Sequence, residues 1–211
     1  MSGIRWGKLL AVLGVAATAV GMGGALLPHA SAATSPAAGS PTSSFQYEIE
    51  EVTAADLPYT YRSGCPVPPE DLRLLIMSYR TFDGQDAQGE MVVHEDWAEP
   101  VVSVFHELYD QDFPIARMQL VDDYQGSDDR SMEANNTSAF NCREVTGRPG
   151  VWSQHSYGGA IDINPVQNPY ISSSGRVLPP AGADYVDRSK SAPGMIHTDD
   201  CTVQAFADIG W

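Results

Sequence analysis

Basic residues are scarce in this chain of 211 residues. Twelve Lys and Arg stand against 27 Asp and Glu, which gives a net charge of −15 at neutral pH. A surface of that sign repels a phosphate backbone, so we expect no nucleic-acid partner. Internal repeats are also missing, and the length suits one globular domain with an extension better than two domains.

Only one long apolar run is present, between Leu9 and Leu27, and several glycines interrupt it. Two basic residues precede the run and the small residues Ala30-Ser31-Ala32 follow it, which is the pattern of a cleaved signal peptide. A membrane anchor is the alternative, because the run approaches the length that spans a bilayer. We predict a signal peptide over 1–32 and therefore a secreted protein, extracellular or in the cell wall, with no stable membrane partner after cleavage. Residues 33–44, rich in Ala, Ser and Pro, are predicted to be a flexible linker.

Cysteine is rare as well, with Cys65, Cys142 and Cys201 as its three positions. An exported protein meets oxidising conditions, so one disulfide and one remaining thiol are expected. We favour pairing of Cys65 with Cys142, which would tie an early loop to the segment before the candidate site described below. Pairing of Cys142 with Cys201 is the competing arrangement.

Hydrophobic patterns predict a mixed set of elements. The expected strands are 45–50, 72–82, 91–93 and 115–121, with 83–90 as a hairpin loop, and the expected helices are 95–110 and 199–209. A buried helix starting at Glu70 is the alternative for the second strand, and the acidic stretch 122–133 is expected to be a solvated loop. In helix 95–110 the buried stripe is predicted to comprise Val101, Val104, Phe105, Leu108 and Tyr109, with His106 outside it. Strands and helices do not alternate regularly, so the predicted fold class is α+β: a single domain over 45–211 with a small antiparallel sheet flanked by helices.

The segment from Ser153 to Asn164 carries the candidate chemistry. Six residues separate His155 from Asp162, and two adjacent glycines between them allow a tight backbone path. The alternating residues 160–163 are expected to form a strand that carries Asp162. An imidazole nitrogen and a carboxylate oxygen are suitable zinc ligands, although a catalytic zinc usually takes three protein ligands and a water. The alternative is a polar turn in which the two side chains only hydrogen-bond.

The string SxHxxGxAxDIN at 153–164 resembles the core motif of the M15 peptidases, the family of D-Ala-D-Ala carboxypeptidases, dipeptidases and peptidoglycan endolysins. Further similarity covers NNTSAFNCR (135–143), the stretch 152–170, VLPPAG (177–182) and AFADIGW (205–211). The resemblance implies an M15-like fold and zinc-dependent hydrolysis of peptidoglycan stem peptides, by D-Ala-D-Ala carboxypeptidase or related wall endopeptidase activity. The bond that is cut and the native metal are left open, and a monomer is expected.

The resemblance also implies roles for individual residues. His155 and Asp162 match the first two zinc ligands, and Ser153 and Asn164 are expected to fix those ligands in place. Arg143 is the candidate for the arginine that polarises the substrate or grips its carboxylate, with a structural ion pair as the alternative. One departure is that many members carry this arginine further upstream in a Tyr-Arg-Ser/Pro motif, whereas 121–125 contains none.

A second departure concerns the C-terminus. In the family an acidic residue and a histidine follow the helix that ends here in AFADIGW, as general base and third ligand, and no such pair follows in this sequence. We therefore expect a truncated chain that is weak or inactive as a hydrolase, or one that binds wall peptide or metal without turnover.

Two other chemistries are weaker interpretations. A serine hydrolase using Ser153 or Ser156 lacks a G-x-S-x-G turn. A calcium loop over 122–133 has Tyr124, Gly126 and Ser127 at positions where two ligands and a glycine are required.

Overall fold

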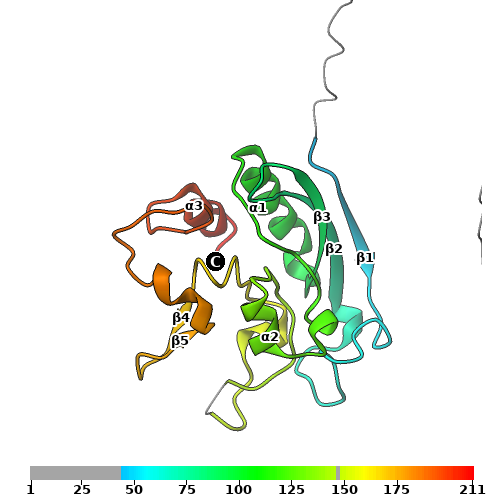
Figure 1. Ribbon diagram of the computed structural model, residues 1–211. Helices are drawn as coiled ribbons and strands as arrows, with labels where there is room; N and C mark the ends of the chain where they lie inside the picture. The colour runs from blue at the N-terminus through cyan, green and yellow to red at the C-terminus, as the bar shows by residue number, and fades with distance from the viewer. Residues whose placement is uncertain (1–43, 146–147) are drawn as a thin grey trace, which may run out of the picture. The chain divides into compact units, whose positions relative to one another are not determined.

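A computed structural model describes residues 44–145 and 148–211, and the predicted signal peptide and all but the last residue of the linker lie outside these ranges. Figure 1 shows a three-stranded sheet with a helix on one face, followed by loops and short helices. The strands are β1 (Tyr47–Glu51), β2 (Leu72–Arg80), β3 (Asp86–His94), β4 (Tyr170–Ile171) and β5 (Val177–Leu178), and the α-helices are α1 (Ala98–Asp110), α2 (Asp128–Glu133) and α3 (Cys201–Asp208). The predicted α+β class is confirmed.

The main sheet is antiparallel in the order β1-β2-β3, and β4 pairs with β5 in a separate ribbon. The strand–turn–strand prediction holds, and the alternative helix from Glu70 does not form. The turn is shorter than expected, because Asp86 already pairs with Arg80 and residues 86–90 belong to β3. Thr81 closes the turn by donating its backbone N–H to the Gln85 carbonyl.

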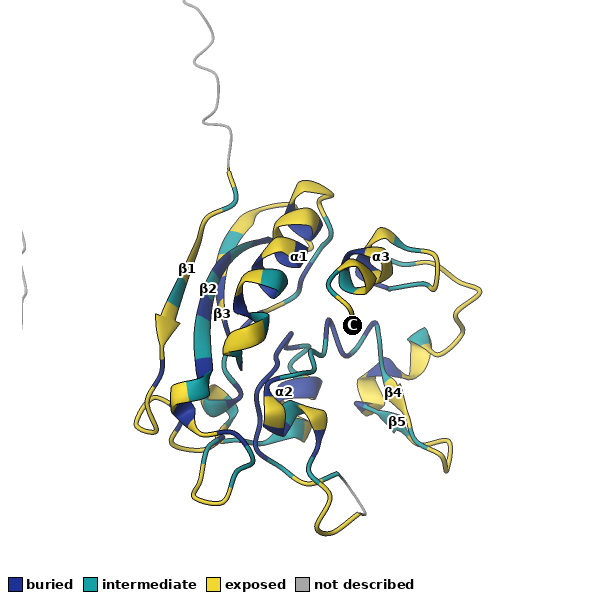
Figure 2. Ribbon diagram, turned by 180° about the vertical axis from the view of Figure 1, so that it is seen from behind, coloured by how far each residue is buried: buried dark blue, intermediate teal, exposed yellow. Residues whose placement is uncertain are grey.

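The helix α1 covers one face of this sheet (Figure 2). Alternate residues of β2 and β3 point toward it, because side chains in a strand alternate between the two faces. The five residues of the predicted helical stripe are all buried, and all of them except Tyr109 belong to this core, together with Leu75, Met77, Met91 and Val93 of the sheet. His106 lies outside the stripe and is exposed, as predicted.

The opposite face of the sheet carries a smaller core near one end. Leu72 and Val92 pack there against Leu57, Phe140 and the half-buried Cys65. The loop that precedes β2 and the segment 138–142 therefore meet over this end of the sheet. Phe140 also donates its backbone N–H to the Val92 carbonyl at 3.0 Å, so the segment runs beside β3.

Two predicted strands do not form. Segment 115–121 makes only isolated bridges, such as Met118 with Thr137, and segment 160–163 pairs only through Asp162 with Ser138. In both cases an apolar alternation is present, but hydrogen-bonding partners occur at single positions rather than along a ladder. The prediction of strands at 115–121 and 160–163 is wrong for this reason.

The acidic stretch 122–133 is not a solvated loop. A 3-10 helix, η3 (Val121–Tyr124), precedes α2, and Ser131 and Met132 are buried. The predicted C-terminal helix is present as α3, but its buried residues are Thr202 and Ala205, whereas Val203 is exposed. Among the described residues no helix is long and apolar enough to cross a membrane.

Candidate functional site

His155 lies in the short 3-10 helix η4 (Gln154–Tyr157), which docks against the end of β3. Ser153 begins this helix and accepts a hydrogen bond from the His155 backbone N–H at 3.4 Å. Gly158 ends it in a left-handed conformation, with φ of 62°, and its carbonyl accepts from the His94 N–H of β3 at 3.1 Å. The imidazole is therefore carried by a turn that is fixed at both ends.

The imidazole ring is oriented by one hydrogen bond. His155 Nδ1 lies 2.7 Å from the Ala139 carbonyl oxygen. A carbonyl only accepts, so Nδ1 must carry a proton, and in the neutral ring Nε2 then presents a lone pair. This is the arrangement of a metal-binding histidine, whose second nitrogen is held by a backbone or carboxylate acceptor.

Asp162 faces that lone pair. Its Oδ2 lies 3.4 Å from His155 Nε2. The Asp162 backbone exchanges two hydrogen bonds with Ser138, at 2.9 and 3.0 Å, which fixes the carboxylate beside the segment that holds the imidazole. The two residues predicted to share a cation are thus brought together.

The distance suits two ligands of one zinc ion. Zinc bonds of about 2.0–2.1 Å at a tetrahedral angle place neighbouring ligand atoms about 3.3 Å apart. A neutral imidazole lone pair opposite a carboxylate oxygen is repulsive unless a cation or a second ring proton lies between them. The pair therefore fits part of a zinc centre, but the described residues contain no group of three His, Cys, Asp or Glu side chains able to hold a metal.

Arg143 lies in a segment whose backbone is hydrogen-bonded to η4 and to Ser153, the residue before it. Its backbone N–H donates to Ser156 Oγ at 2.9 Å, and its carbonyl accepts from the Ser153 N–H at 3.0 Å. Its guanidinium Nη2 lies 2.8 Å from Asp128 Oδ2. The predicted alternative of an ion pair is thus present, and it does not exclude a role toward substrate.

Asp128, the first residue of α2, was not anticipated as a site residue. Burial raises the pKa of its carboxyl group, and the nearby charge of Asp162 raises it further. Arg143 and His155 lower this pKa, but the net shift is upward. Asp128 therefore lies within electrostatic reach of the His155–Asp162 pair. Sequence alone could have indicated the helix start, because Ser127 followed by two acids is a typical N-terminus, but not the partner.

Buried donors without partners lie on the same segment. Asn141 Nδ2 and Arg143 Nε have no hydrogen-bond acceptor among the residues that the structure describes. Buried donors are usually satisfied, so such groups often contact water or a ligand. Their two residues alternate with Phe140 and Cys142, whose side chains belong to the smaller core.

Ser153, Ser156 and Asn164 contact backbone rather than the imidazole or the carboxylate. Ser156 is fully buried and donates to the Arg143 carbonyl at 2.7 Å, which leaves it unsuited as a nucleophile. Asn164, also fully buried, accepts from the Ala116 N–H at 2.9 Å and donates to the Pro114 carbonyl at 2.8 Å. It fixes the chain two residues after Asp162.

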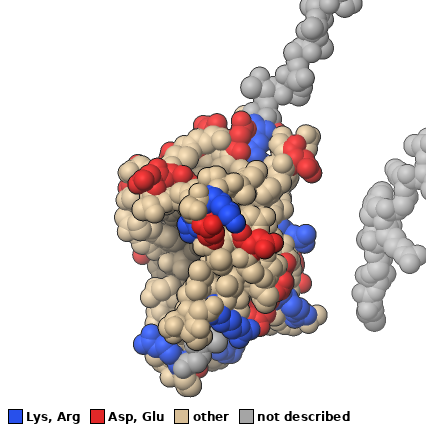
Figure 3. Space-filling model, turned by 60° about the vertical axis from the view of Figure 1, so that its left-hand side comes forward, with Lys and Arg blue, Asp and Glu red and all other residues tan. Residues whose placement is uncertain are grey.

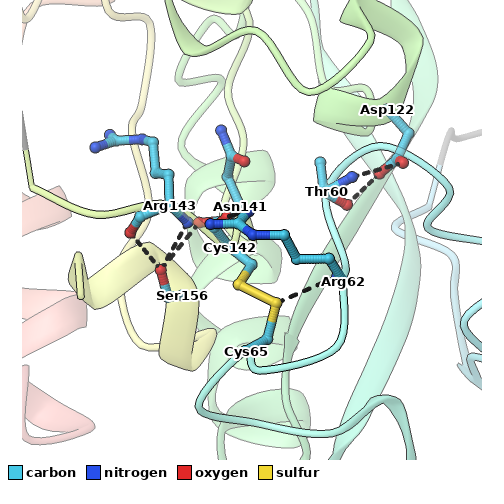
Figure 4. The surroundings of a disulfide bond; sticks show 8 residues. All are labelled: Thr60, Arg62, Cys65, Asp122, Asn141, Cys142, Arg143 and Ser156. Atoms are coloured by element: carbon cyan, nitrogen blue, oxygen red, sulfur yellow. Dashed lines mark hydrogen bonds between the residues drawn. A yellow bond between two sulfur atoms is a disulfide. The ribbon is translucent and has the colours of Figure 1, made fainter. Parts of the chain in front are cut away.

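A disulfide joins Cys65 to Cys142, the pairing favoured on the sequence, and Cys201 is free and exposed. Figure 4 shows that the disulfide lies next to Arg143 and that the same loop reaches Asp122. Arg62 donates to the Cys142 carbonyl at 2.6 Å, and the Asp122 carboxylate accepts from the Thr60 N–H at 3.1 Å. Asp122 is thus occupied by structural bonds, which argues against a calcium loop in this segment.

An open groove of about 700 Å³ borders Asp162 on the side of α3. Its lining is mainly apolar and includes Ile161, Tyr170, Phe206 and Trp211. Tyr170 is 64% exposed, so part of this apolar surface is open to solvent. A groove of this kind next to the His155–Asp162 pair is a suitable place for an extended peptide.

Comparison with known proteins gives one match. The M15 family model described as D-alanyl-D-alanine carboxypeptidase matches residues 146–211, which include His155 and Asp162. No curated protein matches the chain, and no solved structure does. The matched family indicates a peptidase, hence a hydrolase, with carboxypeptidase activity related to peptidoglycan. Residues 146–211 are therefore similar to the M15 peptidases, which confirms the resemblance predicted from the sequence motif.

Proposed function

We propose that this protein is a zinc-dependent peptidase that hydrolyses peptidoglycan stem peptides, as a D-Ala-D-Ala carboxypeptidase or a related wall endopeptidase. The observation that carries the proposal is the opposition of His155 Nε2 and Asp162 Oδ2 at 3.4 Å, with Nδ1 held by the Ala139 carbonyl. That arrangement leaves two electron-pair donors facing one point. The M15 match over the same residues supports it.

Each part of the site would have a separate role in such a reaction. Zinc, when bound by His155 and Asp162, would polarise the scissile carbonyl and activate water. The guanidinium of Arg143 pairs with Asp128, which is within electrostatic reach of the His155–Asp162 pair, and it would stabilise negative charge on the substrate. The groove next to Asp162 takes the stem peptide and excludes water from part of its length.

The proposal includes export and a monomeric state. An oxidised Cys65–Cys142 pair is in keeping with an oxidising compartment, because disulfides persist there. The N-terminal signal-peptide pattern also supports export. Wall peptide is then the partner that the protein meets after cleavage of the signal.

Binding of wall peptide or zinc without turnover is the second candidate for the 211-residue chain. It is favoured by one observation: the described residues bring together His155 and Asp162 but no third metal-binding group beside them. Two ligands hold zinc weakly and leave water poorly activated.

Zinc titration by calorimetry tests the proposal. The purified chain should bind one zinc ion, and His155→Ala and Asp162→Asn should each weaken binding by more than about tenfold, because each removes a ligand. His106→Gln is the matched control, since His106 also faces an aspartate, Asp110 Oδ2 at 3.6 Å, outside the site. It should bind zinc like the wild type.

Release of D-Ala from a peptide ending in D-Ala-D-Ala then separates the two candidates. Turnover that stops with a chelator and returns with zinc supports the peptidase, whereas peptide binding without release supports the second candidate. If His155→Ala and Asp162→Asn bind zinc as tightly as the His106→Gln control, the metal site is not where we place it.

A further inference from the structure

We propose that Asp128 is a positioning residue for Arg143: it holds the guanidinium in one orientation beside the His155–Asp162 pair. This inference rests on the proposed function, because Arg143 is taken to act on the substrate. The inference gives a functional role to the acidic segment 122–133, which lies outside the motif at 153–164.

The contact itself is direct. Arg143 Nη2 and Asp128 Oδ2 are 2.8 Å apart, and only 27% and 26% of the two side chains is exposed. Among the described residues, Asp128 supplies the one carboxylate that pairs with the guanidinium. An ion pair in such a half-buried place is stronger than one at an open surface, because solvent screens it less.

Arg143 needs such a partner, because its other hydrogen bonds within the described part of the chain involve only its backbone. Its N–H and carbonyl are bonded to Ser156 and Ser153, on either side of His155. The side chain beyond has several rotatable bonds and would sample many orientations without a fixed acceptor. A group held ready in one orientation costs less order when substrate binds.

Asp128 is itself held firmly enough to serve as this acceptor. Ser127 begins α2 and accepts from the Arg130 N–H at 3.3 Å. Just before it, Gly126 packs so closely that an added Cβ would lie 2.7 Å from the Tyr59 carbonyl oxygen. Asp122 accepts from the Tyr59 N–H at 2.8 Å, so the loop before Cys65 holds this segment.

The same loop holds both partners of the ion pair. It reaches the Asp128 side through Asp122, and it reaches the Arg143 side through the Cys65–Cys142 disulfide (Figure 4). Cys142 also donates its N–H to the Thr60 carbonyl at 3.0 Å. The distance between the two charged groups is thus set by one loop and not by two independent surfaces.

A double-mutant cycle on peptide cleavage tests the assignment. Asp128→Ala should lower kcat/KM by about 10- to 100-fold, as expected when a group that acts on substrate is misplaced. In the Arg143→Ala background the same substitution should have no further effect. Asp128→Glu should restore part of the loss, zinc affinity should stay within twofold, and Asp129→Asn is the matched control on the exposed side of α2.

Arginine ¹⁵N NMR gives a readout that needs no turnover. In the wild type the Nη groups of Arg143 should rotate slowly and give separate signals, which Arg143→Lys assigns by removing them. Asp128→Asn should merge or shift these signals while Asp129→Asn leaves them unchanged. An inactive wild type with these NMR results overturns the proposed function and keeps the positioning role of Asp128.

Two results overturn the inference. One is an equal loss of kcat/KM from Asp128→Ala in the wild-type and Arg143→Ala backgrounds, which means that Asp128 acts only on folding. The other is an Arg143 signal that does not change in Asp128→Asn.

Discussion

Asn164 lies two residues after Asp162 with φ of 43°, a left-handed conformation that few residues other than Gly, Asn and Asp adopt readily. Its side chain contacts the backbone of Ala116 and Pro114, and its own N–H donates to Thr137 Oγ1 at 3.1 Å. These bonds join three segments that are distant in the sequence. A single carboxamide thus fixes the backbone that presents the Asp162 carboxylate.

Asn164→Ala should destabilise the protein by about 2–4 kcal/mol, because buried backbone groups lose their partners and Ala tolerates this φ poorly. Urea unfolding followed by circular dichroism measures the change. Gln125→Ala is the control for the strain alone, since Gln125 also has positive φ, 56°, but is exposed. A loss no larger than that of the control contradicts a stabilising role for the carboxamide.

At this scale the sequence indicates the candidate ligands better than it indicates the residues around them. His155 and Asp162 are separated by six residues, so a local motif predicts their proximity. Asp128 and Arg143 are fifteen residues apart, with a helix and an extended segment between them. Their contact depends on how the loop of Cys65 holds both, and no local pattern contains that information.

Among the elements, η4 depends on one glycine. An added Cβ at Gly158 would lie 2.4 Å from the His94 backbone nitrogen, and φ there is 62°. At the neighbouring Gly159 an added Cβ meets nothing within 4 Å. The two glycines look equivalent in the sequence, but only the first is required by the contact of η4 with β3.

Gly158→Ala should therefore destabilise the protein by about 3 kcal/mol or more, because left-handed strain adds to a clash with backbone. Zinc affinity should fall as well, since the turn that carries His155 is displaced. Gly159→Ala should change stability by less than about 1 kcal/mol. Urea unfolding and calorimetry of both variants provide the comparison, and equal effects at the two glycines contradict the docking of η4 on β3.

Element prediction succeeds where the periodic face and the burial agree. The stripe of α1 and the hairpin of β2 and β3 follow directly from apolar spacing. It fails at 115–121 and 160–163, where the same alternation is present but the partner is a single residue rather than a strand. It also succeeds for the existence of α3, whose buried positions, Thr202 and Ala205, are set by packing next to α1.

For the whole molecule the excess of acidic over basic residues is large. On the face drawn in Figure 3, acidic and basic side chains are interspersed and neither sign forms a continuous field. Removal of a signal peptide over 1–32 would leave ten basic and 27 acidic residues, a charge of −17. The pH dependence of stability is then governed by the carboxyl groups whose pKa differs from the ordinary value.

These carboxyl groups change the pH dependence of stability in opposite directions. Hydrogen bonds from Thr53 lower the pKa of Asp56, and hydrogen bonds from Ser189 lower the pKa of Asp187, both below the ordinary 3.8. The stability that these two contribute is present above 3.8 and is lost as the pH falls through their folded pKa. Burial raises the pKa of Asp128, so the folded state binds its proton more tightly, and its contribution is lost as the pH rises.

Two variants, Asp128→Asn and Asp56→Asn, separate these opposite effects of pH on stability. As the pH rises from about 4 toward neutral, the free energy of unfolding of the wild type should decrease relative to that of Asp128→Asn, which cannot ionise. As the pH rises through about 4, the wild type should instead gain stability relative to Asp56→Asn. Urea unfolding at closely spaced pH values measures both differences at one salt concentration. If the two differences have the same slope with pH, the Asp128 carboxyl has no raised pKa, and the ion pair with Arg143 outweighs its burial.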